Sequence, residues 1–326
     1  MEQTEFIDWD VAAKVGAAVV PPGPAVSPDE AAEVVASIRA AADAAPAHVR
    51  EASGLDTPAD AVTLVVDRPS WIAACARGTH TILGEVDSPL APGALASCLG
   101  RVEGGGAGLM FAAVSTRVLG QFDPFGPPSA LLLVAPNIVA AERALAADPA
   151  DFRLWVCLHE QTHRFQFGQA PWLPGHLTGL MSALLEDESG LFHFRRADKP
   201  GERFIDRVLT PAQRDVFDRI TAVMSLIEGH ADVMMDRAGT GVIPTLPAIR
   251  RAFEARRDRG GWAAVVGKLI GTDLKLAQYR EGAAFCRTVI DEAGVDGLNA
   301  AWSSAELLPS LPELRDPQRW LARVHG

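Results

Sequence analysis

Residues 154–167 read LWVCLHEQTHRFQF, and they contain His159, Glu160 and His163 in the spacing HExxH. Residues four apart lie on one face of an α-helix, so His159 and His163 can direct two imidazole nitrogens at a single metal ion. Glu160 lies one step around the helix, where its carboxylate can contact a metal-bound water molecule without being a ligand. This spacing is typical of zinc hydrolases, and it predicts a helix that carries a zinc site.

Apolar residues lie on both sides of the motif: Phe152, Trp155, Val156, Leu158, Phe165 and Phe167. Their pattern predicts a helix that is buried on most sides. Polar groups are costly to bury unless something pairs them, which favours a metal site. The alternative is a helix whose histidines are only hydrogen-bonded within a core.

A zinc site of this type takes a third protein ligand from elsewhere in the chain and keeps one position for water. Glu228 is the best candidate, because it lies in a long amphipathic helix that the Thr-Pro pair at residues 210–211 is expected to begin. Asp232 lies four residues later on the same face and is expected to orient a ligating imidazole. His230 and the acidic cluster at residues 186–188 are the alternative third ligands.

Further candidates surround these ligands. Gly229 is costly inside a helix, by about 1 kcal/mol relative to alanine, so we expect it to allow close contact with the motif helix. Residues 168–179, GQAPWLPGHLTG, are rich in Gly and Pro and predict an irregular segment beside the metal. His176 in that segment and His230 are candidates for the substrate cleft, although His176 is better explained as a solvent-facing loop histidine.

Tyr279 lies beside Arg280 in a predicted helix at residues 273–292. A tyrosine hydroxyl can donate a hydrogen bond to the oxyanion that forms during hydrolysis of a carbonyl compound. Tyr279 is therefore a candidate catalytic residue. The alternative is a tyrosine packed between helices, with its hydroxyl bonded internally.

Composition limits the class of protein. The chain has 326 residues and 48% hydrophobic content, which is enough for a large core. Its net charge is −11, with 30 basic and 41 acidic residues and no basic run, which argues against a nucleic-acid partner. The first residues do not resemble a signal peptide and no apolar run is long enough to span a membrane, so we expect a soluble cytoplasmic protein. The four cysteines form no CxxC pair, and we expect free, buried thiols.

We expect a predominantly helical α+β fold with a small sheet beside the HExxH helix. The apolar run at residues 131–134 predicts a buried strand, which would hold an extended peptide by edge pairing. Helices are predicted at 8–20, 27–43, 46–52, 69–84, 107–118 and 138–147, among others. Residues 1–125 would form a helical part packed on a catalytic part at 126–326, and both would belong to a single unit.

Several segments carry a family resemblance. They are VLGQFDPF, LLLVAPNI, the stretch quoted above, APWLPGHL, IEGHADVMMD, KLAQYREGAAFC and LNAAWSSAELLPSLPEL. Their combination resembles a bacterial family of zinc-dependent metalloproteases with a zincin-like fold, which is sometimes labelled as associated with deazaflavin coenzyme biosynthesis. HEQTH followed by EGHAD is similar to the gluzincin pattern, in which the glutamate of ExxxD completes HExxH. The separation of His163 and Glu228 is longer than in thermolysin-like enzymes. The metzincin pattern is excluded, because Gln166 and Gln169 stand where it has glycine and a third histidine.

The residues and the resemblance together predict a zinc metallohydrolase of the metallopeptidase type. His159, His163 and Glu228 would hold one Zn²⁺ per chain, and Glu160 would act as the general base in cleavage of an amide bond. The substrate would be a peptide or a small amide, and a non-peptide amide or ester is a further possibility. The alternative is a non-catalytic zincin-like protein, whose metal site is structural or whose cleft binds a partner or a coenzyme precursor.

Overall fold

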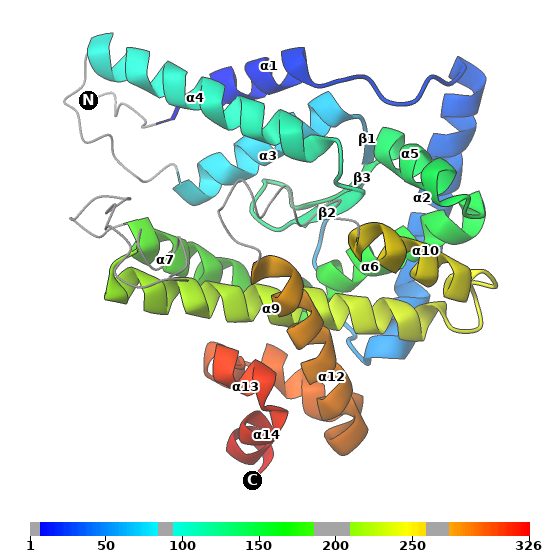
Figure 1. The fold of residues 1–326 in the computed structure, drawn as a ribbon, viewed down its shortest axis with the longest axis vertical. Coiled ribbons are helices and arrows are strands. Elements are labelled where there is room, and N and C mark those ends of the chain that lie inside the picture. The colour runs from blue at the N-terminus through cyan, green and yellow to red at the C-terminus, as the bar shows by residue number, and fades with distance from the viewer. Residues whose placement is uncertain (1–6, 84–93, 186–208, 259–273) are drawn as a thin grey trace. The chain divides into compact units, whose positions relative to one another are not determined.

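The computed structural model describes residues 7–83, 94–185, 209–258 and 274–326 (Figure 1). These residues are mostly helical and include one three-stranded sheet, as the sequence predicts. They divide into two compact units, one within residues 1–45 and 60–161 and the other within residues 46–59 and 162–326. The predicted division near residue 125 stays a prediction. None of the helices in the described residues is long and apolar enough to cross a membrane.

The sheet of the first unit consists of β1 (Val62–Val66), β2 (Gly120–Asp123) and β3 (Ala130–Val134). β3 lies in the centre, parallel to β1 and antiparallel to β2, and all five of its residues are buried. The predicted strand is thus confirmed, because its uninterrupted apolar run fits a position with neighbours on both sides. Edge pairing of a peptide to this strand is a wrong prediction, since both edges of β3 are occupied. The edge strands are β1 and β2, which the sequence analysis did not find.

Helices cover the sheet of the first unit. They are α3 (Arg68–Leu83), α4 (Ala94–Ser115) and α5 (Ala135–Leu145), and α1 (Trp9–Val19) packs on α3 and α4. Trp71 and Ile72 of α3 share a buried cluster with Leu132 and Val134 of β3. α4 begins earlier than the predicted residue 107, because the glycines at 104–108 lie inside the helix. A Cβ on Gly108 would lie 2.4 Å from the Ala12 carbonyl oxygen, so this glycine allows α1 and α4 to pack closely.

Two helices each contain a point at which the chain passes from one unit to the other. α2 (Pro28–Ser53) is one helix although two were predicted, because the chain continues helically through Pro46. The buried residues Ala42, Ala45 and Val49 keep one apolar face on both sides of that proline, and this packing outweighs the hydrogen bond that proline cannot make. α6 (Pro149–Gln169) carries the HExxH motif, as predicted.

The second unit also contains α7 (Leu173–Leu185), α9 (Pro211–Gly239), α10 (Leu246–Asp258) and α12 (Leu274–Asn299). Thr210 and Gln213 form a capping box at the start of α9, which confirms the predicted helix start. α9 packs on α12 where two glycines meet, and a Cβ on Gly282 would lie 1.9 Å from the Ser225 carbonyl oxygen. Gly229 contacts α12 at this point. The prediction that Gly229 faces the motif helix is therefore wrong.

The segment at 168–179 is almost entirely helical, so the predicted irregular structure is wrong. α6 continues to Gln169 and α7 begins at Leu173. Pro174 lies in the first turn of α7, where proline costs no hydrogen bond. Gly168 is required by packing, because a Cβ there would lie 2.1 Å from the Thr57 carbonyl oxygen.

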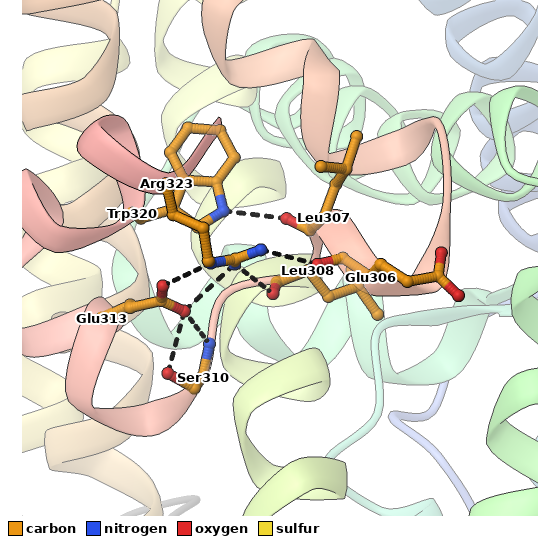
Figure 2. A network of polar contacts seen from close by, with 7 residues as sticks. All are labelled: Glu306, Leu307, Leu308, Ser310, Glu313, Trp320 and Arg323. Carbon is orange, nitrogen blue, oxygen red and sulfur yellow. Dashed lines mark hydrogen bonds and ion pairs between the residues drawn. The ribbon is translucent and has the colours of Figure 1, made fainter. Parts of the chain in front are cut away.

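The C-terminal segment is held by one arginine (Figure 2). Arg323 of α14 (Pro317–His325) donates hydrogen bonds to both carboxylate oxygens of Glu313 and to the carbonyls of Glu306 and Leu308. Trp320 donates to the Leu307 carbonyl at 2.8 Å. These bonds fix the Pro-rich stretch that follows Trp302 and leads into α13 (Leu311–Arg315).

Candidate metal centre

Two histidines of α6 and one glutamate of α9 supply three possible metal ligands. His163 Nε2 lies 3.9 Å from Glu228 Oε1, and His159 precedes His163 by one turn of the same continuous helix. One ligand atom from each residue lies within 4.8 Å of the others. Ligand atoms about 2 Å from a tetrahedral Zn²⁺ lie about 3.3 Å from one another, so small side-chain rotations bring all three into range. Two imidazoles with one carboxylate form a donor set that suits zinc.

The side-chain amide of Gln166 contacts Nδ1 of His163. Its amide group is buried, and its Nε2 donates to the Ile227 carbonyl at 2.9 Å. Since that carbonyl can only accept, Gln166 Oε1 faces the other way, and it lies 2.9 Å from His163 Nδ1. His163 Nδ1 is therefore the donor. Nε2 then carries no proton, which is the tautomer that a metal ligand on this side needs.

His230 lies behind Gln166 in the core. Its side chain is completely buried, and its Nδ1 accepts from Gln166 Nε2 at 2.9 Å. Its ring meets the Trp302 ring edge to face at 5.1 Å. Burial, with a smaller contribution from His163, lowers the pKa of His230 to about 3, so the ring is neutral. The side chain of His230 therefore contacts the side chains of Gln166 and Trp302.

Glu160 of α6 is almost completely buried, with 6% of its surface exposed, and it lies beside the first residue of β2. A Cβ built on Gly120 would lie 2.6 Å from Cγ and 2.7 Å from Cδ of Glu160. Glycine is thus the residue that leaves room for this carboxylate. The edge strand β2 begins beside Glu160, which confirms that the sheet lies next to the HExxH helix.

Asp232 is held by Arg250 of α10. Arg250 Nη1 donates to Asp232 Oδ1 at 2.8 Å, and Nη2 donates to Oδ2 at 3.1 Å. The same guanidinium also binds Asp236. This bidentate pair fixes the carboxylate that the sequence analysis assigned to orient a histidine, and that assignment stays a prediction.

The remaining candidates are His176, Tyr279 and the acidic cluster at residues 186–188. His176 is half-buried in α7, with its ring edge to face with Trp172 at 5.8 Å, and burial lowers its pKa. Tyr279 belongs to α12, but its side chain is outside the described residues, as are residues 186–188. Cys75, Cys157 and Cys286 are free and buried, as predicted, and burial raises the pKa of each thiol.

The sequence analysis missed Gln166, Gly120 and Arg250. A signal for Gln166 was available, because it lies three residues after His163 on the same helix face and between two phenylalanines. Metal-ligating histidines almost always donate their second ring N–H to a hydrogen-bond acceptor. Gly120 and Arg250 had no local signal, since each acts on a residue far away in the chain.

Comparison with known proteins shows which family this chain resembles. Residues 7–321 match the family model of the zincin-like metallopeptidases. A crystal structure from Chloroflexus aurantiacus, described as a hydrolase candidate with a novel fold, is 27% identical and has a TM-score of 0.69, covering 98% of this chain and 99% of that chain. No curated protein matches the chain. Because the family model spans nearly the whole sequence and the expected ligands converge, the chain belongs to the zincin-like metallopeptidase family.

Proposed function

We propose that this protein is a zinc-dependent metallopeptidase, in which His159, His163 and Glu228 hold one Zn²⁺. Family membership and the similarity to a hydrolase candidate support a metallohydrolase in general. The observation that carries the proposal is the convergence of two imidazoles and a carboxylate within 4.8 Å. The helix that supplies the two imidazoles also carries Glu160. A purely structural zinc site more often has four protein ligands, so a group of three favours catalysis.

Glu160 is the general base in this proposal. A bound Zn²⁺ supplies Lewis-acid activation of water and of the carbonyl that is attacked. Glu160 accepts a proton from the attacking water molecule as the water oxygen bonds to the carbonyl carbon. Glu160 then delivers the proton to the leaving amine as the C–N bond breaks. Tyr279 is the candidate donor to the oxyanion, and Asp232 the candidate that orients a histidine.

The position of β2 favours an extended substrate. β2 is an edge strand of the described sheet, and its first residue, Gly120, borders Glu160. An edge strand can pair with an extended peptide through backbone hydrogen bonds. A peptide bound in this way would lie beside the general base, which favours peptide cleavage over hydrolysis of a small amide or ester.

The substitution Glu160→Gln tests the proposal. We expect the purified wild-type protein to carry one zinc per chain and to cleave members of a peptide library in a chelator-sensitive way. Glu160→Gln should keep zinc, measured by plasma mass spectrometry, and lose cleavage. Glu103→Gln, on an exposed part of α4, is the matched control and should keep both.

Two outcomes would reject parts of the proposal. Turnover retained in Glu160→Gln would remove this residue as the base. A wild-type protein that binds zinc but cleaves no peptide, amide or ester would reject catalysis, and would leave a zincin-like protein whose cleft binds a partner or a coenzyme precursor.

A further inference from the structure

Gln166 connects the two helices that supply the metal ligands of the second unit. Its Oε1 accepts a hydrogen bond from His163 Nδ1 at 2.9 Å, and its Nε2 donates to the Ile227 carbonyl at 2.9 Å. Ile227 directly precedes Glu228. One buried amide therefore touches the ring of one ligand and the backbone next to another, so its position affects the spacing of the two.

The amide can have only one orientation. Ile227 offers a carbonyl oxygen, and the nitrogen of the Gln166 amide must face it. A histidine without an acceptor at Nδ1 is free to place its proton on Nε2, and that nitrogen then cannot bind a metal. The Gln166 oxygen stabilises the tautomer with the proton on Nδ1, and it also limits rotation of the ring.

A second layer of buried residues holds Gln166. His230 Nδ1 lies 2.9 Å from Gln166 Nε2, and the His230 ring packs edge to face on Trp302, which is completely buried. The Trp302 carbonyl accepts from Trp172 Nε1 at 3.1 Å. The stretch that follows Trp302 is tied down by Arg323 (Figure 2). A continuous series of contacts thus runs from the C-terminal segment to His163.

We propose that Gln166 is a positioning residue, which presents His163 to the metal in the correct tautomer and sets the distance from His163 to Glu228. His230 and Trp302 keep its amide in place. This inference rests on the proposed function only in taking His163 and Glu228 as metal ligands. It makes no use of peptide cleavage.

Gln166→Met tests the inference, with Gln161→Met as a matched control. Gln161 lies five residues earlier in the same helix, is equally buried, and donates to one backbone carbonyl, that of Ala42. Each variant loses one buried side-chain amide, but only the amide of Gln166 contacts the proposed metal ligand His163. We expect zinc affinity, measured by competition with a chelator, to fall about 10–100-fold in Gln166→Met and to stay unchanged in Gln161→Met.

Two further measurements separate positioning from general stability. Nitrogen-15 NMR of the metal-free protein should show His163 with its proton on Nδ1 in the wild type and in Gln161→Met, and a mixture of tautomers in Gln166→Met. Gln166→Glu keeps an acceptor for Nδ1–H and should recover most of the zinc affinity, even if it is as unstable as Gln166→Met. Gln166→Glu also replaces Gln166→Met as the test variant if Gln166→Met does not fold.

The inference is overturned if Gln166→Met and Gln161→Met weaken zinc binding equally, or if Gln166→Glu is as weak as Gln166→Met. Either result would make Gln166 a structural residue alone. If zinc affinity follows Gln166 while the wild type cleaves nothing, the positioning role stands and the proposed peptidase activity fails. The two ideas are therefore tested separately.

Discussion

Gly120 and Glu160 are in direct contact, and no side chain fits between them. A Cβ on Gly120 would lie 2.9 Å from Glu160 Oε1 and closer still to Cγ and Cδ. Such distances are shorter than van der Waals contact, so any other residue at position 120 must displace the Glu160 carboxylate or β2. The edge strand and the proposed base are thus fitted to each other.

Gly120→Ala should therefore impair the proposed reaction while zinc remains bound. A displacement of the base by about 1 Å can lower a rate about 100-fold. Peptide cleavage and zinc content of the variant give the test. Gly105→Ala is the control, because a Cβ there meets nothing within 4 Å. Unchanged cleavage in Gly120→Ala would mean that Glu160 does not need its observed position.

Glu228→Ala should lower zinc occupancy, because it removes one of the three ligands. Asp215→Ala removes an exposed carboxylate from the same helix, and it should leave occupancy unchanged. Zinc per chain after dialysis against a weak chelator measures the difference. Equal occupancy in the two variants would move the third ligand to another residue, and the acidic cluster at 186–188 would be examined next.

Gly282→Ala should destabilise the protein, because its Cβ would collide with the Ser225 carbonyl oxygen of α9. Overpacking of this kind costs about 1–3 kcal/mol. Gly175→Ala is the control, since Gly175 is an exposed glycine inside α7 with nothing within 4 Å of an added Cβ. Its replacement should stabilise the helix by up to about 1 kcal/mol. Thermal unfolding distinguishes the two, and melting temperatures that shift alike would contradict the close packing of α9 on α12.

Asp236 should make stability depend on pH. Burial raises its pKa from 3.8 to about 6, with Asp232 adding to the shift and Arg250 and Arg287 opposing it. One guanidinium is shared by two carboxylates, and Asp236 Oδ1 makes no hydrogen bond within the described residues. Between pH 4 and 6 the folded state binds this proton more tightly than the unfolded state, so the contribution of Asp236 to stability falls as pH rises.

Asp236→Asn provides the comparison. The free energy of unfolding of the wild type, relative to this variant, should decrease by about 1 kcal/mol as pH rises from about 4 to 6, after allowance for solvent screening of a partly exposed group. Denaturant unfolding at several pH values measures it. A difference between the two proteins that does not change with pH would show that Asp236 titrates normally.

Features that depend on neighbours in the chain were predictable from the sequence. The spacing of His159 and His163 follows from helix geometry, the start of α9 follows from the Thr210 capping box, and the apolar run at 131–134 predicted β3. Glu228 was chosen because it lies in the long amphipathic helix that Thr210 begins, with Asp232 one turn later on the same face. In each case the signal is a periodicity or a cap, which a few consecutive residues contain.

Local sequence signals gave wrong predictions of secondary structure in two places. The glycines and prolines of 168–179 predicted an irregular segment, but Pro174 lies in the first turn of α7, where proline is compatible with a helix. Pro46 predicted a break, but α2 continues through it because both sides bury one apolar face. Packing against the rest of the molecule outweighed intrinsic preference at these sites.

The sequence by itself determined the motif helix, its two imidazoles, the carboxylate on a second helix and the resemblance to a zinc-dependent family. Only the tertiary structure decided that Gln166 joins His163 to the backbone beside Glu228, that Gly120 meets Glu160, and that Gly229 faces α12. The reason is physical. A side chain's partner across the fold depends on how helices and strands pack, and that packing arises from the whole core, whereas helix periodicity and capping arise within a few turns of the chain.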